Sequence, residues 1–159
     1  MLSAFLKKLL FARQLFMTDG RIEVLGTNQV MLPSDIIVAL QSLDEKKYYD
    51  VVKMGIQSNM VEYTKKLGSN SQGMFKITED IFETYGLGKP EIVVLDQKKK
   101  CATVRFHGTP VGAACSKYAE CVLLPAALAG MFSFLFQKDV NCAVQKCDAK
   151  GSMLQYEVK

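Results

Sequence analysis

The strongest constraint on the fold is a charge-free apolar segment, CVLLPAALAGMFSFLF, which occupies residues 121–136. It is shorter than the ~20 apolar residues that a helix needs to cross a bilayer. A short helix that is apolar on every side is typical of the interior of a globular protein. We therefore predict a buried central helix over residues 121–136 and no transmembrane segment.

Composition sets the broad class of the protein. A chain of 159 residues with 49% apolar and 23% charged residues predicts one globular domain that buries its own core. The formal charge of +4 is mild, and a nucleic-acid interface normally needs a denser basic surface, so no nucleic-acid partner is expected. Five cysteines, an odd number, and no convincing secretory signal favour free thiols in a cytoplasmic protein.

The first 45 residues predict small peripheral elements. MLSAFLKKLLFARQLF has the apolar spacing of an amphipathic helix, which would pack on its own domain or on a twin chain. Contact of this helix with a membrane surface is the alternative. Turn signals at Asp19-Gly20 and Gly26-Thr27 predict a small hairpin, with apolar positions at Ile22, Val24, Val30 and Leu32. Ser34 is the expected cap of a short helix that ends near Leu43.

A long amphipathic helix is predicted after Asp44, which should cap it. One apolar stripe continues for about six turns, at Tyr49, Val52, Ile56, Met60, Tyr63 and Leu67. Gly55 interrupts this helix at a cost of roughly 1 kcal/mol relative to alanine, so we expect another element to pack closely there. Residues 68–73 are expected to form a loop, followed by a short helix over 78–85.

The second half predicts the main sheet. Two strands joined by a lysine-rich turn (91–96 and 101–106) precede the central helix, and two more strands (141–147 and 153–158) follow it. This order predicts an α+β fold: a twisted antiparallel sheet covered on one face by helices, with a long buried central helix, an N-terminal helix and a small hairpin. We expect a single domain over 1–159, in which 46–159 form the core and 1–45 the N-terminal elements.

No catalytic set stands out, because the chain has one histidine and lacks a phosphate-binding loop or a GxSxG motif. A ligand pocket beside the central helix is the more concrete hypothesis, since Ala126, Ala129 and Gly130 would leave space there. The same pattern would also build a filled core. The candidate pocket residues are His107 and four residues of the helix: Leu124, Leu128, Met131 and Phe132. His107 opens a loop and could line the mouth of a cavity; a surface or capping histidine is the alternative.

Three blocks of the second half carry a family resemblance. YGLGKPEIVVLDQKKKCATVRFHGTP, the apolar helix with a cysteine at its start and ALAG inside it, and CDAKGSMLQYEV resemble the 4-vinyl-reductase (4VR) domain family over residues 48–159. That family is similar to subunits of the TRAPP vesicle-tethering complexes and to the sensor domains of phenol-responsive activators. The chain looks like a small, stand-alone, archaeal-type member. The resemblance implies a homodimer with a hydrophobic pocket for small apolar or aromatic ligands.

Some members of the 4VR family bind zinc, and the resemblance places part of that site here. Cys121 matches the ligand at the start of the buried helix, and Cys147 matches the second cysteine. Val144 stands where the family has glutamate, and Gln155 (or Leu154) stands where it has a third cysteine. Valine cannot bind a metal and glutamine is a poor substitute for a thiolate. We therefore expect no cofactor; zinc at an incomplete site is the alternative.

The favoured function is non-enzymatic: binding or sensing of a small hydrophobic, aromatic or lipid-like molecule by a homodimer. The second hypothesis is a protein–protein interaction scaffold of the TRAPP type, with the first helix and its neighbours as the dimer face. The third is a component of a vinyl reductase, which would require a hydride or electron donor. No nucleotide fingerprint or cofactor cluster supports that third hypothesis.

Overall fold

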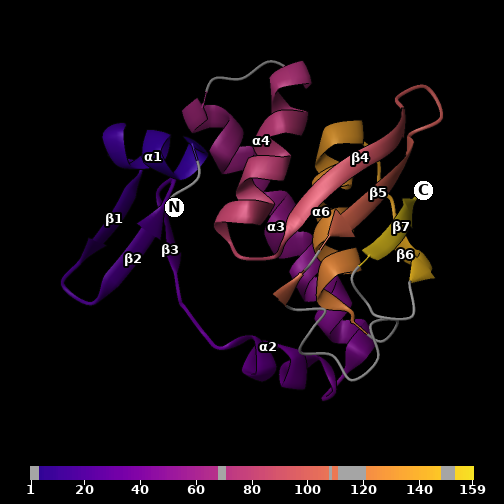
Figure 1. Ribbon diagram of the computed structural model, residues 1–159, viewed down its shortest axis with the longest axis horizontal. Helices are drawn as coiled ribbons and strands as arrows, with labels where there is room; N and C mark the ends of the chain where they lie inside the picture. Colours follow the sequence, from indigo (N-terminus) through magenta and orange to yellow (C-terminus); the bar gives the residue numbers. More distant parts are fainter. Residues whose placement is uncertain (1–3, 68–70, 108, 111–120, 148–152) are drawn as a thin grey trace.

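The structure, a computed structural model, describes residues 4–67, 71–107, 109–110, 121–147 and 153–159 (Figure 1). Its larger sheet consists of β4 (Lys89–Asp96), β5 (Cys101–His107), β6 (Cys142–Cys147) and β7 (Met153–Val158). These strands are antiparallel in the order β4-β5-β7-β6. The predicted α+β class and its antiparallel sheet are confirmed.

One face of this sheet is buried because apolar residues alternate along its strands. Ala102, Val104 and Phe106 of β5 are buried, and the residues between them are half exposed. Val104 lies opposite Tyr156 of β7. The Phe106 and Tyr156 rings meet edge to face with their centroids 5.9 Å apart, a geometry that aromatic pairs prefer.

The central helix α6 (Leu123–Phe136) lies between the helix α3 (Glu45–Leu67) and the sheet, and it contacts α3 along with β6 and β7. Eleven of its residues are buried, which confirms the predicted central helix. Gln41 contributes to its start, because the backbone N–H of Val122 donates to the Gln41 side-chain oxygen over 2.9 Å. No helix within the described ranges has the length and apolar character needed to cross a membrane.

The predicted apolar stripe of α3 is confirmed: all six of its positions belong to the core or pack against it. Asp44 caps the helix as predicted, since its Oδ1 accepts a hydrogen bond from the Lys47 N–H over 2.9 Å. The prediction for Gly55 is wrong. Gly55 is exposed, and a Cβ built on it would have nothing within 4 Å. The close approach occurs at Gly130 of α6 instead.

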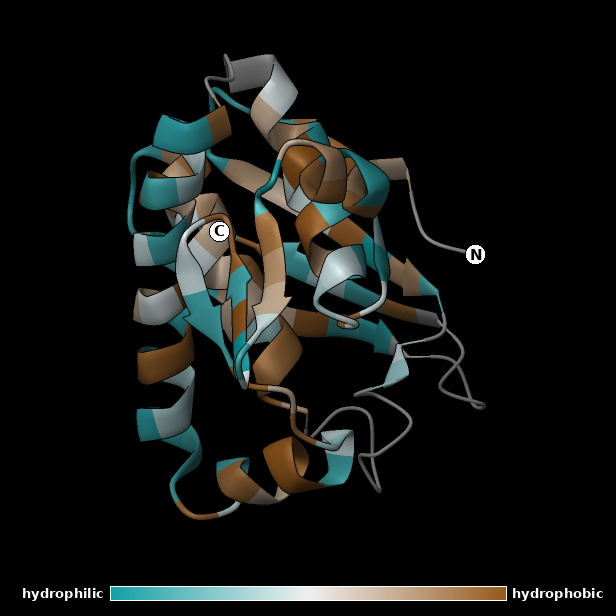
Figure 2. Cartoon of the chain, turned by 90° about the vertical axis from the view of Figure 1, so that its left-hand side faces the viewer, coloured by the Kyte–Doolittle hydropathy of each residue, from teal (hydrophilic) through white to brown (hydrophobic). Residues whose placement is uncertain are grey.

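The N-terminal elements are α1 (Ala4–Phe11) and a separate antiparallel sheet of β1 (Leu15–Thr18), β2 (Arg21–Val24) and β3 (Thr27–Gln29). The expected hairpin is therefore extended by a third strand, which pairs with β2 after a turn at Leu25-Gly26. The helix α2 (Ser34–Gln41) lies near the start of α3 and contacts it (Figures 1 and 2). Ser34 does not cap it; Pro33 holds that position without a side-chain hydrogen bond.

The helix α4 (Ser71–Thr84) is longer than expected, and the predicted loop over 68–73 is wrong in its second half; residues 68–70 lie outside the described part of the chain. Tertiary packing overrides the local glycine and polar residues, because Met74 is buried and the Phe75 ring lies 6.4 Å from that of Phe132. The helix ends at Thr84, and Gly86, with a φ of +70°, follows it in the left-handed conformation. Leu87 N–H donates to the Phe82 carbonyl, which completes a Schellman motif.

Candidate functional site

The four candidate pocket residues of α6 lie in the packed core. Each of them is at most 1% exposed, and the Phe132 ring lies 5.3 Å from that of Phe136. Gly130 leaves no free space beside the helix, because the α3 backbone lies against it. None of the three hollows described below is lined by Leu124, Leu128, Met131 or Phe132. Their role in ligand binding stays a prediction.

His107 is the last residue of β5, and its side chain is exposed. Its Nε2 lies 3.3 Å from a carboxylate oxygen of Glu91 on the neighbouring strand. Arg105 lies 3.6 Å from the same oxygen. His107 thus belongs to a cluster of charged side chains on the surface, apart from the three hollows described below.

The cysteines of the expected incomplete zinc site are only partly described. Cys121 is buried just before α6. The backbone of Cys147 ends β6 opposite Leu154, but its side chain lies outside the described residues. Val144, which replaces the family's glutamate, is half-buried on β6 and lies opposite Tyr156. Within the described ranges, no three histidine, cysteine or carboxylate side chains form a cluster that could hold a metal ion.

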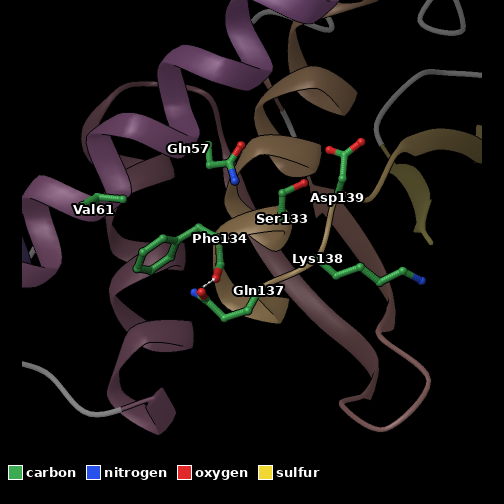
Figure 3. Close-up of a pocket in the computed structure, with 7 residues that line it drawn as sticks. All are labelled: Gln57, Val61, Ser133, Phe134, Gln137, Lys138 and Asp139. Atoms are coloured by element: carbon green, nitrogen blue, oxygen red, sulfur yellow. Dashed lines mark hydrogen bonds between the residues drawn. The ribbon is translucent and has the colours of Figure 1, made fainter.

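The first hollow, of about 340 Å³, lies between α3 and the end of α6 (Figure 3). In Figure 3, Phe134 points toward Val61, and the Gln137 amide donates to the Phe134 carbonyl over 2.6 Å. Ser133 Oγ already accepts a hydrogen bond from Val140 N–H and donates to the Val140 carbonyl. Asp139 is paired with Lys53, so several polar groups of this hollow already have partners within the protein, and the hollow offers few of them to a ligand.

The second hollow, of about 600 Å³, lies between α1 and α4 and is largely charged. Lys76 pairs there with Asp80, with Nζ 3.7 Å from Oδ1, and Lys8 and Glu83 also line it. An apolar molecule would displace water from these charged groups without replacing their interactions, which disfavours its binding.

The third hollow, which we call the N-terminal hollow, is mostly apolar and has a volume of about 430 Å³. It lies among α1, the three-stranded sheet, the segment that follows β3, α2 and the end of α4. Val30 and Met31 on its wall are 79% and 75% exposed. The lining residues are Leu6, Leu15, Met17, Ile22, Val24, Gln29, Val30, Met31, Leu32, Ile37, Thr84, Tyr85 and Gly86.

Three polar side chains form a hydrogen-bonded chain that begins at the N-terminal hollow. The Gln29 side-chain N–H donates to the Tyr85 hydroxyl over 3.4 Å. The Tyr85 hydroxyl is in turn hydrogen-bonded to the hydroxyl of Tyr63, which is 1% exposed. Burial and the neighbouring Tyr63 raise the pKa of Tyr85 far above the ordinary tyrosine value. The Tyr85 hydroxyl therefore stays neutral near neutral pH.

Sequence reasoning missed this hollow. It assigned Val30 and Leu32 to the small hairpin, whereas β3 ends at Gln29 and both residues follow it in an irregular segment. The available signal was a run of three apolar residues, Val30, Met31 and Leu32, directly before Pro33. That run alone cannot indicate a hollow, because the opposite wall comes from α4, more than fifty residues further along the chain.

Comparisons with known proteins place the chain by its fold. No protein-family model and no curated protein matches the sequence. The phenol-responsive sensory domain of the transcription activator PoxR, solved with phenol, is similar with a TM-score of 0.71 and 15% identity, over 99% of this chain and 91% of that one. Subunit 3 of a trafficking protein particle complex from Naegleria fowleri, covalently bound to palmitic acid, is similar with a TM-score of 0.53 and 13% identity, over 79% of this chain and 93% of that one. The chain therefore has the fold of these two proteins, which confirms the expected structural likeness to phenol sensor domains and TRAPP subunits.

Proposed function

We propose that this chain is a non-enzymatic domain that binds or senses a small hydrophobic molecule, and that the N-terminal hollow is the binding site. The observation that carries the proposal is the hollow itself. Its volume of about 430 Å³ falls in the range of about 300–1,000 Å³ that is typical of small-molecule sites. Its wall combines many apolar side chains with a few polar groups, as ligand pockets do.

The exposed apolar side chains of the hollow supply a driving force for binding. Burial of apolar surface stabilises by roughly 25 cal/mol per Å², and Met17, Val30 and Met31 all expose more than half of their surface. Methionine side chains adapt to irregular ligand shapes. Further support comes from the two proteins of like fold, one solved with phenol and the other carrying palmitic acid.

Binding is a better proposal than catalysis because of the groups on the wall. The polar side chains of its lining are those of Gln29, Thr84 and Tyr85, and the lining contains no histidine, cysteine, carboxylate or amine. None of these three polar groups is a strong nucleophile or base near neutral pH. The proposed action is therefore recognition of an apolar molecule, with the signal leaving through a partner chain.

The test measures binding of two probes, 2-ethylnaphthalene and 1-decanol, by thermal unfolding and by calorimetry. Either probe should raise Tm in a saturable way, because ligands that bind only the folded state stabilise it. Val30→Asp should weaken binding at least tenfold, since a carboxylate on the wall would be desolvated. Val93→Asp, at an exposed apolar position of β4, is the matched control and should leave affinity unchanged. Absence of binding by both probes would overturn the proposal.

We also propose that the chain acts as a homodimer through an apolar face of α3. Val51, Met54 and Val61 lie on one side of this helix, and they are 62%, 67% and 40% exposed. In Figure 2, hydrophobic residues of α3 interrupt its hydrophilic surface. Gly55 on the same helix has open space above it, which would let another chain approach closely. A TRAPP-like scaffold that binds a different protein through this face is the alternative.

Native mass spectrometry tests the homodimer. The wild-type chain should give twice the monomer mass of 17.7 kDa, and Met54→Glu should shift it to the monomer. Lys46→Glu, an exposed substitution outside the apolar face, is the control. A wild-type monomer at all concentrations would overturn the homodimer and favour the scaffold.

Membership of the 4VR family also stays a proposal, supported by the shared fold and by the C-terminal block of sequence.

A further inference from the structure

The hydrogen-bonded chain at the N-terminal hollow has a fixed orientation at one end. Both N–H bonds of the Gln29 side chain have acceptors: the Thr27 carbonyl at 3.3 Å and the Tyr85 hydroxyl at 3.4 Å. A flipped amide would place its oxygen against the Thr27 carbonyl, which cannot donate. Gln29 therefore uses its amide nitrogen as a donor to Tyr85.

At the other end of this series of hydrogen bonds, the burial of Tyr63 determines which hydroxyl is the donor. Tyr63 is 1% exposed, and within the described ranges its hydroxyl bonds only to the Tyr85 hydroxyl. A buried hydroxyl that does not donate its proton leaves a polar group unsatisfied, which costs about 1–3 kcal/mol. The satisfied arrangement therefore has Tyr63 as the donor and Tyr85 as the acceptor.

Of the three side chains, Tyr85 is then the one whose donor proton has no acceptor. Its oxygen accepts from both Gln29 and Tyr63, which uses the two lone pairs of a hydroxyl. Its own proton has no acceptor among the described residues, and Tyr85 is one of the lining residues of the hollow. Tyr85 thus brings a hydrogen-bond donor without an acceptor to a mostly apolar hollow, whose other polar side chains are those of Gln29 and Thr84.

We propose that the ligand of the N-terminal hollow is an uncharged apolar molecule with one hydrogen-bond acceptor oxygen, a carbonyl or a hydroxyl, that accepts the Tyr85 proton. This inference rests on the proposed function and adds the chemical class of the ligand. A single donor in an apolar wall supplies orientation and specificity, whereas the apolar surface supplies most of the affinity.

The ligand is uncharged because the hollow contains no group that could neutralise a charge. None of its lining residues is ionised near neutral pH. A carboxylate that loses its water without a cationic partner pays a large desolvation cost. One neutral hydroxyl does not offset that cost.

The test compares three naphthalene probes by calorimetry. 2-Acetylnaphthalene and 2-isopropenylnaphthalene have nearly the same shape and differ in whether an oxygen or a CH₂ group is double-bonded to the side-chain carbon. A neutral hydrogen bond predicts about three- to tenfold tighter binding of the ketone to the wild-type chain. 2-Naphthoate, the anionic probe, should bind more weakly than the ketone.

Two variants connect this preference to the Tyr85 proton. Tyr85→Phe should bring the ratio of the two affinities close to one. Tyr63→Phe, the matched control, also removes a hydroxyl but leaves the Tyr85 proton, so the preference for the ketone should remain. Tyr85→Phe alone leaves the buried Tyr63 hydroxyl without a hydrogen-bond partner and could destabilise the protein. The double variant Tyr63→Phe/Tyr85→Phe removes both hydroxyls, and its ratio of affinities should match that of Tyr85→Phe.

The outcomes separate this inference from the proposed function. Equal binding of the ketone and the alkene to the wild type would overturn the acceptor requirement while the hydrophobic site stands. A ketone preference that survives Tyr85→Phe would also overturn it, because the donor would then lie elsewhere. Tighter binding of 2-naphthoate would overturn the uncharged class. Failure of every apolar probe would overturn the proposed function itself.

Discussion

Gly130 of α6 lies directly against the backbone of α3 at Lys53. A Cβ placed on Gly130 would come within 2.4 Å of the Lys53 carbonyl oxygen and 3.1 Å of the Ile56 Cβ. The two helices can approach this closely only because Gly130 has no side chain. This contact lies within the extensive packing of the central helix against α3.

Gly130→Ala should therefore destabilise the protein strongly. Its methyl group would meet a backbone carbonyl, which cannot move aside as the end of a flexible side chain can. Overpacking of this kind costs typically 1–3 kcal/mol and occasionally more. Urea unfolding followed by circular dichroism measures the loss as a lower midpoint.

Gly55→Ala is the matched substitution on α3, and it should raise the free energy of unfolding, whereas Gly130→Ala should lower it. The position is exposed and helical, and a Cβ there would meet no other atom. The variant should therefore be up to about 1 kcal/mol more stable, because alanine has the higher helix propensity. The same urea experiment reports it as a higher midpoint. If Gly55→Ala destabilised as much as Gly130→Ala, the close contact would be assigned to the wrong glycine.

The mostly buried side chain of Lys53 should be sensitive to loss of its partners. Its Nζ lies 2.8 Å from Oδ1 of Asp139, whose side chain is 81% exposed, and 2.9 Å from Asn141 Oδ1, while the Lys53 side chain is 10% exposed. Asp139→Asn removes the opposite charge, which should cost about 1 kcal/mol, because water screens the exposed carboxylate. Lys53→Met keeps the volume and removes the charge, so its cost should be smaller.

Lys65→Met serves as the surface control for this pair. Lys65 Nζ lies 2.8 Å from Glu62 Oε1, but both side chains are exposed and water screens their attraction, so the loss of this pair should change stability very little. Thermal unfolding at low and high salt measures the loss of stability in Asp139→Asn, Lys53→Met and Lys65→Met. An Asp139→Asn cost no larger than that of Lys65→Met would show that the Lys53 pair is screened like a surface pair.

Stability should fall at alkaline pH because of Cys142 and Tyr85. Burial raises the pKa of the Cys142 thiol and of the Tyr85 hydroxyl, so both stay protonated in the folded chain. The unfolded chain loses these protons at the ordinary pKa values near 9.0 and 10.0. The stabilisation is therefore complete below pH 9 and is lost as pH rises further, by up to about 1.4 kcal/mol per pH unit for each group.

Cys142→Ala isolates the thiol's part of this pH dependence. The variant should unfold more easily at neutral pH, because it leaves a small cavity, but its stability should fall less steeply between pH 9 and 10. Urea titrations across this pH range give the slope directly. A slope identical to that of the wild type would rule out a buried thiol at this position.

Zinc should be well below one equivalent in the purified chain. Val144 and Gln155 occupy two of the four ligand positions that the 4VR resemblance implies, and neither side chain is a suitable zinc ligand. Elemental analysis measures the metal, and EDTA should leave Tm unchanged. Stoichiometric zinc with a drop in Tm on chelation would mean that other residues complete the site.

Patterns within single elements allowed most of the fold to be predicted. The charge-free run over 121–136 predicted a buried helix, and the order of the strands around it predicted an antiparallel sheet. The first part of α4 could not be predicted in this way. Its glycine and polar residues favour a loop locally, and burial of Met74 against distant residues determines the helix.

The candidate site was less accessible to sequence reasoning. The four α6 residues chosen as a pocket are apolar, and an apolar residue has the same appearance in sequence whether it lines a cavity or fills a core. The two glycines show the same limit. Nothing in the sequence distinguishes an exposed Gly55 from a Gly130 pressed against a neighbouring helix.

The sequence by itself determined the class of each main element and the burial of α6, because hydrophobic periodicity acts over a few residues. Only the tertiary structure decided where free volume remains and which polar side chains line it. The N-terminal hollow is assembled from segments as distant as Leu6 and Tyr85. Free volume depends on how closely such segments pack, and packing is a property of the whole chain.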